Sequence, residues 1–440
     1  MTDLLDYADR VWRGEETMKA YHSGALRAEG LHEVAPEVWT WPAFGNVHVF
    51  PTAEGLFCFD TGSAATAPDL FAATRARTDA ALHTAVYSHG HIDHVFGTAP
   101  FDADAARRGL PRPTVLAHEN VPRRFRRYQA SQGYNSVINQ RQFQNPGIEW
   151  PAEFRFPDLT VADATTVRLG ELSVRLRHAR GETDDHLTAW LPDRGILCTG
   201  DLFIWSCPNP GNPQKTQRYA LEWAQALRRM AALDAELLLP GHGVPIVGAQ
   251  RVRTALLDTA ELLQTLHDQT LAAMNAGATL DEVLREVTAP DELLRKPYLA
   301  PSYDEPEFIV RNVWRHYGGW YDGDPAHLKP APAGDLAGEI ARLAGGGPAL
   351  AERARELLAA GELRLAGHLA QFAVDADPAD HLAHAARVEV FLALRAAATS
   401  TMAKGVYGWA VAESRAALDG GDRDEALRAD GPERTSWAAL

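Results

Sequence analysis

The chain has 440 residues, of which 46% are hydrophobic and 23% are charged. These fractions are ordinary for soluble globular proteins, and they exclude a disordered, collagen-like or disulfide-scaffold chain. The sequence contains 43 Lys and Arg residues against 58 Asp and Glu residues, which gives a net charge of −15. Because nucleic acids and anionic membrane surfaces attract basic proteins, neither is an expected partner.

The cysteines and the apolar segments bear on the location of the protein. Cys58, Cys198 and Cys207 are odd in number and far apart, which is typical of reduced thiols in a cytoplasmic protein. No apolar run reaches the roughly 18 residues that suggest a membrane span. The acidic stretch 1–14 does not have the pattern of a secretory signal. We therefore expect a cytoplasmic protein without a membrane partner.

The first part of the chain predicts a mixture of strands and helices. Residues 1–34 have the spacing of an amphipathic helix and a linker. Short strands separated by Pro and Gly turns follow, and strands then alternate with helices. We expect strands at 38–41, 46–50, 56–59, 84–87, 114–116, 172–176, 187–191, 195–198 and 236–239, and helices near 66–76, 95–108 and 216–232. This order predicts a layered α/β or α+β architecture in which helices cover sheets.

The strand pattern ends after about residue 248, and the remainder predicts helices. The Pro-, Gly- and Ala-rich stretch 330–347 has the composition of a flexible joint. We divide the chain into an N-terminal helical segment (1–34), a catalytic α/β domain (35–250), a helical domain (251–425) and a tail (426–440).

A dense cluster of potential metal ligands follows the predicted strand at 84–87. The loop contains His89, His91, Asp93 and His94, and Gly90 relaxes the backbone between the first two. Packing alone does not call for these four side chains in one loop. Imidazole and carboxylate groups suit zinc or another first-row divalent ion. The spacing would allow the first two residues to face one ion and the last two to face a second.

The pattern His-x-His-x-Asp-His after a strand resembles the signature of the metallo-β-lactamase fold, an αββα sandwich with one or two metals at its edge. Three later turns, at 180–183, 197–201 and 239–243, match the other ligand positions of that fold. Most members have a histidine in the first of these turns, whereas this chain has Glu182. That glutamate resembles the alkylsulfatases, zinc-dependent enzymes that hydrolyse alkyl sulfate esters. Their carboxylate at the second turn is often glutamate, whereas here it is Asp201.

This resemblance implies an αββα sandwich followed by an all-α dimerisation domain, in a homodimer without the lipid-carrier-like domain of larger members. It implies two zinc ions, and iron or manganese would also suit the ligands. The implied ligands are His89, His91 and Glu182 for one ion, Asp93, His94 and His242 for the other, and Asp201 as a bridge. Asp93 and Asp201 are the candidate catalytic carboxylates. His186 lies four residues after Glu182 and is an alternative to it as a ligand.

Two polar stretches could hold an anionic substrate. Alkylsulfatases bind sulfate with an asparagine and basic residues in the loop that corresponds to 208–218, which implies this role for Asn209, Lys215 and Arg218. The arginine fork fits a tetrahedral oxyanion well. In the family the polar region near 132–141 lines the pocket, which adds Tyr134, Asn139 and Arg141 as candidates. Aromatic residues such as Trp205 and Tyr303 could line a tunnel for an alkyl chain, although a core or interface is the more common place for them.

Three functions remain open at this point. The first is hydrolysis of a small anionic alkyl sulfate ester by a water molecule activated at a dinuclear metal centre, with cleavage of either the C–O or the S–O bond. The second is hydrolysis of another ester, a lactone, a thioester or a β-lactam, since a carboxylate would also satisfy the basic loop. The third is an iron-dependent oxidoreductase, because an added carboxylate ligand suits iron.

Overall fold

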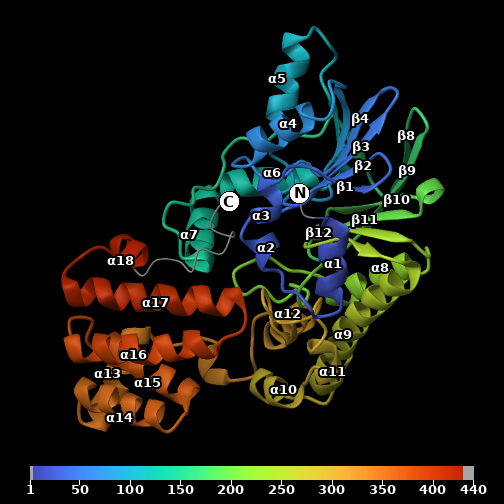
Figure 1. Ribbon diagram of the computed structural model, residues 1–440. Helices are drawn as coiled ribbons and strands as arrows, with labels where there is room; N and C mark the ends of the chain where they lie inside the picture. The colour runs from blue at the N-terminus through green and yellow to red at the C-terminus, as the bar shows by residue number, and fades with distance from the viewer. Residues whose placement is uncertain (1–2, 430–440) are drawn as a thin grey trace.

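Two β-sheets packed face to face form the centre of the N-terminal part of the protein (Figure 1). The computed structural model describes residues 3–429. The first sheet contains, in spatial order, β1 (His32–Ala35), β2 (Val38–Trp41), β3 (Val47–Thr52), β4 (Gly55–Phe59), β5 (Leu82–Val86), β6 (Thr114–His118) and β7 (Leu159–Val161). The second contains β13 (Ile246–Val247), β12 (Leu237–His242), β11 (Ile196–Ile204), β10 (His186–Leu191), β9 (Leu172–Ala179) and β8 (Ala164–Leu169).

Successive side chains of the first sheet enter two different cores, as expected for a strand that is covered on both faces. Val49 pairs with Cys58 across β3 and β4, and both pack towards the helices on the outer face. The next pair, Phe50 and Phe57, faces the second sheet instead. This alternation holds the sandwich together, because each strand contributes apolar area to both of its faces.

Helices cover both outer faces of the two sheets. The first sheet carries α4 (Ala67–Arg75), α5 (Ala99–Arg107) and α6 (Val121–Ala130), whose residues Leu70, Phe101 and Phe125 complete the outer core. The second sheet carries α8 (Ala220–Ala231) and α9 (Ala249–Asn275), which pack against each other. The predicted αββα sandwich is therefore confirmed.

The N-terminal segment and the long connections add further elements around the sandwich. They are α1 (Leu4–Trp12), α2 (Lys19–His22), α3 (Ala25–Ala28), α7 (Gln132–Phe143), the 3₁₀ turns η1 (Pro192–Arg194) and η2 (Pro325–His327), α10 (Leu280–Glu286), α11 (Asp291–Leu294) and α12 (Pro306–Gly318). Helix α1 contacts β1 and β13, and its Trp12 stacks on Tyr298 with ring centroids 4.9 Å apart.

A helical bundle lies beside the sandwich (Figure 1). It contains α13 (Ala333–Ala344), α14 (Gly347–Ala359), α15 (Leu363–Ala376), α16 (His381–Ala397), α17 (Thr401–Asp419) and α18 (Arg423–Ala429). Small side chains such as Ala373 and Ala386 fill its core, which lets the helices approach closely. The predicted all-α domain after the sandwich is confirmed. The predicted tail starts within α18, and residues 430–440 lie outside the described residues.

The prediction of a flexible joint over 330–347 is wrong, because α13 occupies most of this stretch. Its composition is rich in glycine and alanine, but Ala337 and Ala341 recur at helical spacing and are buried where α13 packs on α15. Packing therefore overrides the local composition. None of the helices described here combines the length and the apolar run that a membrane crossing requires.

Helix α17 is the bundle helix that packs against α7 (Figure 1). The contact is close because α17 has glycines there. A Cβ atom on Gly405 would lie only 2.1 Å from the backbone oxygen of Gln142, and one on Gly408 would lie 1.9 Å from the side chain of Gln144. Only glycine permits this approach, which ties the bundle directly to α7.

Candidate metal centre and adjoining pocket

The histidine-rich loop leaves the end of β5 and is packed tightly by its neighbours. Gly90 lies between His89 and His91, and a Cβ atom there would be 2.8 Å from Arg124 Cδ and 3.1 Å from Asp185 Oδ2. The loop therefore runs directly over a buried arginine–aspartate pair. Glycine is required at this position to bring the two histidines to the same side.

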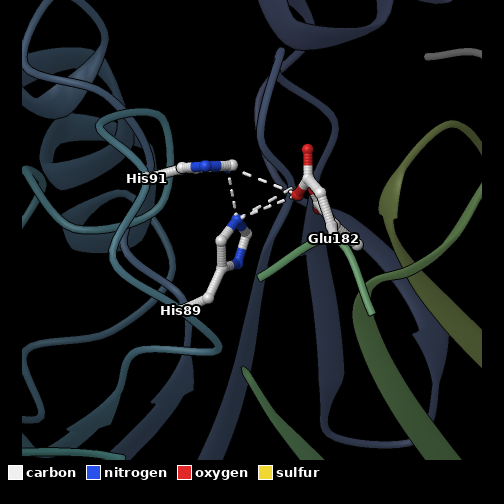
Figure 2. A group of neighbouring side chains, drawn as sticks. His89, His91 and Glu182 are labelled. Carbon is white, nitrogen blue, oxygen red and sulfur yellow. Dashed lines mark hydrogen bonds and ion pairs between the residues drawn. The ribbon is translucent and has the colours of Figure 1, made fainter. Parts of the chain in front are cut away.

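The first group of candidate ligands comprises His89, His91 and Glu182 (Figure 2). Glu182 Oε2 lies 3.3 Å from His89 Nε2 and 3.3 Å from His91 Nδ1. The two ring nitrogens are 2.8 Å apart. Figure 2 shows the two rings on one side and the carboxylate of Glu182 on the other, directed towards one another. The structure thus assembles the set that the sequence implied for one ion.

The second group comprises Asp93, His94 and His242, and Asp201 lies between the two groups. Asp93 Oδ2 is 3.3 Å from His94 Nε2 and 3.4 Å from His242 Nε2. Asp201 reaches towards both groups, since its Oδ2 is 3.1 Å from His242 Nε2 and 3.7 Å from His89 Nε2. Its other oxygen is 3.3 Å from His94 Nε2. This is the position that a bridging carboxylate would need.

These residues fit two divalent cations. Three buried atoms that face the centre, His94 Nε2, Glu182 Oε2 and Asp201 Oδ1, make no hydrogen bond to any of the described residues. Buried polar atoms rarely lack a partner, and imidazole nitrogens with carboxylate oxygens form the donor set of zinc. Burial alone would lower the pKa of His94, but Asp93 and Asp201 raise it well above its usual value. The same field favours cations at this place.

His186, the alternative to Glu182, lies behind the centre. Its Nε2 accepts a hydrogen bond of 3.0 Å from the backbone N–H of Asp201, and its ring stacks on that of His89 with centroids 4.8 Å apart. A nitrogen engaged in this way cannot also face an ion, and the grouped ligand atoms around His89 and His91 include Glu182 but neither nitrogen of His186. The geometry therefore favours Glu182, and it gives His186 the task of supporting both His89 and Asp201.

Glu182 is fixed by the polar loop that follows β11. Its Oε1 accepts hydrogen bonds from Asn209 Nδ2 at 2.7 Å and from Arg218 Nη1 at 2.6 Å. Arg218 also donates to the backbone oxygen of Asn209 at 2.8 Å. Burial would raise the pKa of the Glu182 carboxyl, but Arg218 and His91 hold it well below its usual range. One oxygen is thus tied to the loop, and the other is left to face the histidines.

A pocket with a cavity volume of about 70 Å³ opens next to the two ligand groups. Its polar wall includes four predicted substrate-binding residues: Asn139, Asn209, Lys215 and Arg218. Its apolar wall is formed by Met18, Phe44, Phe143, Trp150, Ile204 and Trp205. Trp205 and Tyr303 therefore line the pocket, the place that the sequence analysis considered the less common one.

Lys215 occupies an unusual place for a lysine. Its Nζ donates to Asn139 Oδ1 at 3.2 Å and lies 5.4 Å from the ring centroid of Trp150. Burial lowers the pKa of Lys215 to about 7, and repulsion from Arg218 acts in the same direction. An anion in the pocket would restore the charge of this lysine.

Tyr134 and Arg141 are not among the residues that line this pocket, and their role as substrate contacts stays a prediction. On α7 the buried residues are Asn135, Ile138, Asn139, Gln142 and Phe143. Tyr134 points outwards and is 64% exposed. Arg141 lies between the polar loop and the bundle, since its guanidinium donates to Gln214 of that loop and is 5.7 Å from the ring centroid of Trp409 on α17. The helical phase of α7 separates these two side chains from the pocket.

Two family profiles match the chain. Residues 40–242 match the metallo-beta-lactamase superfamily, and residues 279–417 match the alkyl sulfatase dimerisation family. The chain joins a metallo-β-lactamase domain to an alkylsulfatase dimerisation domain. This finding confirms the resemblance drawn from the ligand motif and from Glu182.

Curated relatives and solved structures agree with this assignment. A linear primary-alkylsulfatase from Pseudomonas sp. is 27% identical over 83% of this chain and 73% of its own length. An (R)-specific secondary-alkylsulfatase from Pseudomonas sp. is 28% identical over 82% of this chain, which spans only 58% of that relative. A stereoselective inverting sec-alkylsulfatase from Pseudomonas sp. has the same fold, with a TM-score of 0.78, 24% identity and coverage of 88% of this chain and 65% of its own.

The metallo-β-lactamase domain contains supporting residues that the sequence analysis missed. Asp60 Oδ2 accepts a 2.9 Å hydrogen bond from His94 Nδ1, and its Oδ1 accepts one of 2.6 Å from the Ser88 backbone N–H. Asp60 adopts a φ of 62°, a strained conformation for a residue other than glycine. The one sequence signal that could have pointed to Asp60 is its position directly after the predicted strand 56–59.

Other missed residues of this domain connect distant parts of the chain. Asn46 Nδ2 donates to the backbone oxygens of Pro240 and Gly243 at 3.0 and 2.8 Å, which holds the turn that carries His242. Arg124 is buried and donates to Asp185 at 2.5 Å and to Asp184 at 2.6 Å. No local pattern announces these bonds, because each joins segments that are far apart in sequence.

Proposed function

We propose that this protein hydrolyses alkyl sulfate esters at a centre of two divalent metal ions. The observation that carries the proposal is the pocket itself. It has two groups of metal-binding side chains at one end, the cations Lys215 and Arg218 beside them, and an apolar wall that includes Phe143 and Trp205. An alkyl sulfate ester has a monoanionic head and an apolar body, and both parts find complementary surface here.

Zinc is the metal that we propose for both groups. Imidazole and carboxylate ligands of this kind are typical of catalytic zinc sites. His89, His91 and Glu182 would hold one ion, and Asp93, His94 and His242 would hold the other, with Asp201 shared. When bound, two such ions lower the pKa of a water molecule and polarise the ester.

The residues of the chain would bind and orient the ester. Arg218 and Lys215 attract the sulfate oxygens, and Asn209 can donate a hydrogen bond to them. Arginine offers a planar fork for an oxyanion, and its charge is retained at any working pH. The carboxyl of Asp93 stays ionised because His94 and His242 lower its pKa to about 2 against the effect of burial. The apolar wall excludes water from the rest of the substrate.

The decisive experiment measures sulfate release from dodecyl sulfate next to turnover of a nitrophenyl ester and a β-lactam. We expect sulfate release by the wild type. Asp93→Ala and Glu182→Ala should each lower it by more than about 100-fold, since even partners of metal ligands contribute 10–100-fold. Ester turnover without sulfate release would transfer the proposal to a different ester bond. Iron in protein purified without added metal, together with oxygen consumption, would instead support an oxidoreductase.

We also propose that the protein is a homodimer. Residues 279–417 match the alkyl sulfatase dimerisation family, which supports this assembly. Light scattering at micromolar concentration should give about 96 kDa, twice the 48.1 kDa of the chain. A mass of one chain across the concentration range would contradict the proposal.

A cytoplasmic location remains part of the proposal. Cys58, Cys198 and Cys207 are buried and unpaired among the described residues, which suits a reducing compartment. Fractionation of the source cells would test the location directly, and recovery of the protein outside the cytoplasm would contradict it.

A further inference from the structure

A second cavity lies on the outer face of the second sheet and shares no lining residue with the metal-side pocket. It has a volume of about 200 Å³ and is bounded by β9, β10 and the C-terminal end of α8. Three of its lining residues are arginines: Arg175 and Arg177 of β9 and Arg229 of α8. We call this cavity the arginine groove.

The two arginines of β9 are held on one face by the strand. Arg175 and Arg177 are two residues apart, so their side chains leave the same side of the sheet. In the ladder Arg175 pairs with Trp190 and Arg177 pairs with Thr188, and both partners also line the groove. The sheet therefore presents two guanidinium groups in parallel next to an indole ring.

The three guanidinium groups have no anionic partner in the structure. Among residues 3–429, none of them forms a hydrogen bond or an ion pair with its side chain. Burial lowers the pKa of Arg229, and repulsion from Arg177 adds to this effect, while Asp163 opposes it only in part. All three arginines are exposed, so water and salt screen much of their mutual repulsion, and an anion can reach them from solvent. An anion between them would relieve this repulsion.

The rest of the lining is mixed, because His178 and Thr188 are polar whereas its largest other side chains are apolar. Trp190 contributes from β10, Met230 contributes from α8 next to Arg229, and Leu233 follows at the end of that helix. Leu233 is one of the exposed large apolar side chains of the protein. Cationic and apolar surfaces thus meet within a single small cavity.

We propose that the arginine groove binds a small anionic amphiphile, with its oxyanion between Arg175, Arg177 and Arg229 and its aliphatic part against Trp190, Met230 and Leu233. Charge complementarity selects the head group, and the apolar side chains select a short chain over a free inorganic ion. The groove is independent of the metal centre, so this site goes beyond the proposed hydrolysis.

Isothermal titration of the full-length protein with octane-1-sulfonate tests the proposal, because its C–S bond is not a sulfate ester and it is not consumed. We expect two binding events per wild-type chain and one event in the Arg177→Ala/Arg229→Ala variant, whose sulfate ester turnover should stay within twofold of the wild type. The Arg218→Ala variant should lose the other binding event, which we assign to the metal-side pocket. If the Arg177→Ala/Arg229→Ala variant binds the probe with the stoichiometry and affinity of the wild type, the proposed binding site in the arginine groove is wrong. This holds whether or not the metal-side pocket binds the probe.

Further probes and a matched variant separate charge from apolar contact. Arg168 lies on the outer face of β8 outside the groove, so Arg168→Ala removes the same kind of charge nearby and should leave both events unchanged. Loss of a binding event in the Arg168→Ala variant would show that binding depends only on the general positive charge of this face, and it would contradict the proposed site.

Inorganic sulfate and octan-1-ol should each bind the groove at least tenfold more weakly than octane-1-sulfonate. Equal binding of sulfate would overturn the apolar part of the site. Octanoate should bind as well, since arginine forks also match carboxylates.

Discussion

At the scale of single residues, the candidate metal centre depends on side chains that never face it. Arg124 is buried between the loop of His89 and His91 and the loop of Glu182, and it bonds to two aspartates. The side chain of Asp185 is fully buried, whereas that of Asp184 is 38% exposed. The two aspartates therefore offer the same substitution in very different surroundings.

We expect Asp185→Asn to weaken zinc binding at the first ligand group by about 10–100-fold, as is usual for residues that support metal ligands. The variant should also lose about 3 kcal/mol of unfolding free energy, because it leaves Arg124 with an incomplete buried ion pair. Zinc titration of the apo protein against a chelating dye measures the first effect, and urea unfolding measures the second. Asp184→Asn is the control and should change each quantity far less. Equal effects in the two variants would show that Arg124 contributes only general charge.

Lys215 gives a second expectation at this scale. In the proposed reaction the charged form of Lys215 would bind the sulfate group, and burial lowers the pKa of this lysine to about 7. Raising the pH removes the proton, so KM for dodecyl sulfate should rise between about pH 6 and about pH 8, and Lys215→Arg should abolish this rise because arginine stays charged. A KM that is flat with pH in the wild type would contradict a binding role for the lysine charge.

At the scale of the elements, helix phase explains which sequence predictions succeeded. The ligands in 88–94 form a local motif, so their grouping could be predicted without a fold. Asn139 lines the pocket whereas Tyr134 and Arg141 do not, a difference that composition could not predict because it marks a polar helix without showing which face is buried. Asp60, Asn46 and Arg124 could not be found from the sequence, since their partners lie in other elements.

Helix α17 allows a matched test of how the bundle contacts α7. Gly405→Ala places a methyl group against the Gln142 backbone and should cost about 1–3 kcal/mol of unfolding free energy. Gly338→Ala on α13 makes the same change where no atom lies within 4 Å, and it should gain about 0.5–1 kcal/mol through helix propensity. Urea unfolding of both variants measures the difference. Since α7 carries Asn139 and Phe143, Gly405→Ala should also raise KM. A stabilised Gly405→Ala variant would show that this contact is loose.

At the scale of the whole molecule, the metals would compensate a concentration of buried negative charge. Asp93, Glu182 and Asp201 are all buried at one edge of the sandwich in a chain that is already acidic. Removal of metal should therefore lower the melting temperature, and added zinc should restore it. For metal at 100 times its Kd the stabilisation is about 2.7 kcal/mol. Differential scanning calorimetry with and without a chelator measures the change. A Glu182→Ala variant should show a smaller drop, and an unchanged wild-type melting temperature would contradict tight metal binding.

The short helix α2 has a consequence for how specificity is built. Met18 and Tyr21 of this region line the pocket, yet they precede residue 40, where the metallo-β-lactamase match begins. The hydroxyl of Tyr21 bonds to the backbone oxygens of Ala43 and Phe44, and the Phe44 ring lies against His242. Part of the pocket wall is thus encoded outside the stretch that holds every candidate ligand, although the other wall residues lie within it. Sequence drift in the N-terminal stretch can reshape the choice of substrate while every metal-binding residue stays unchanged.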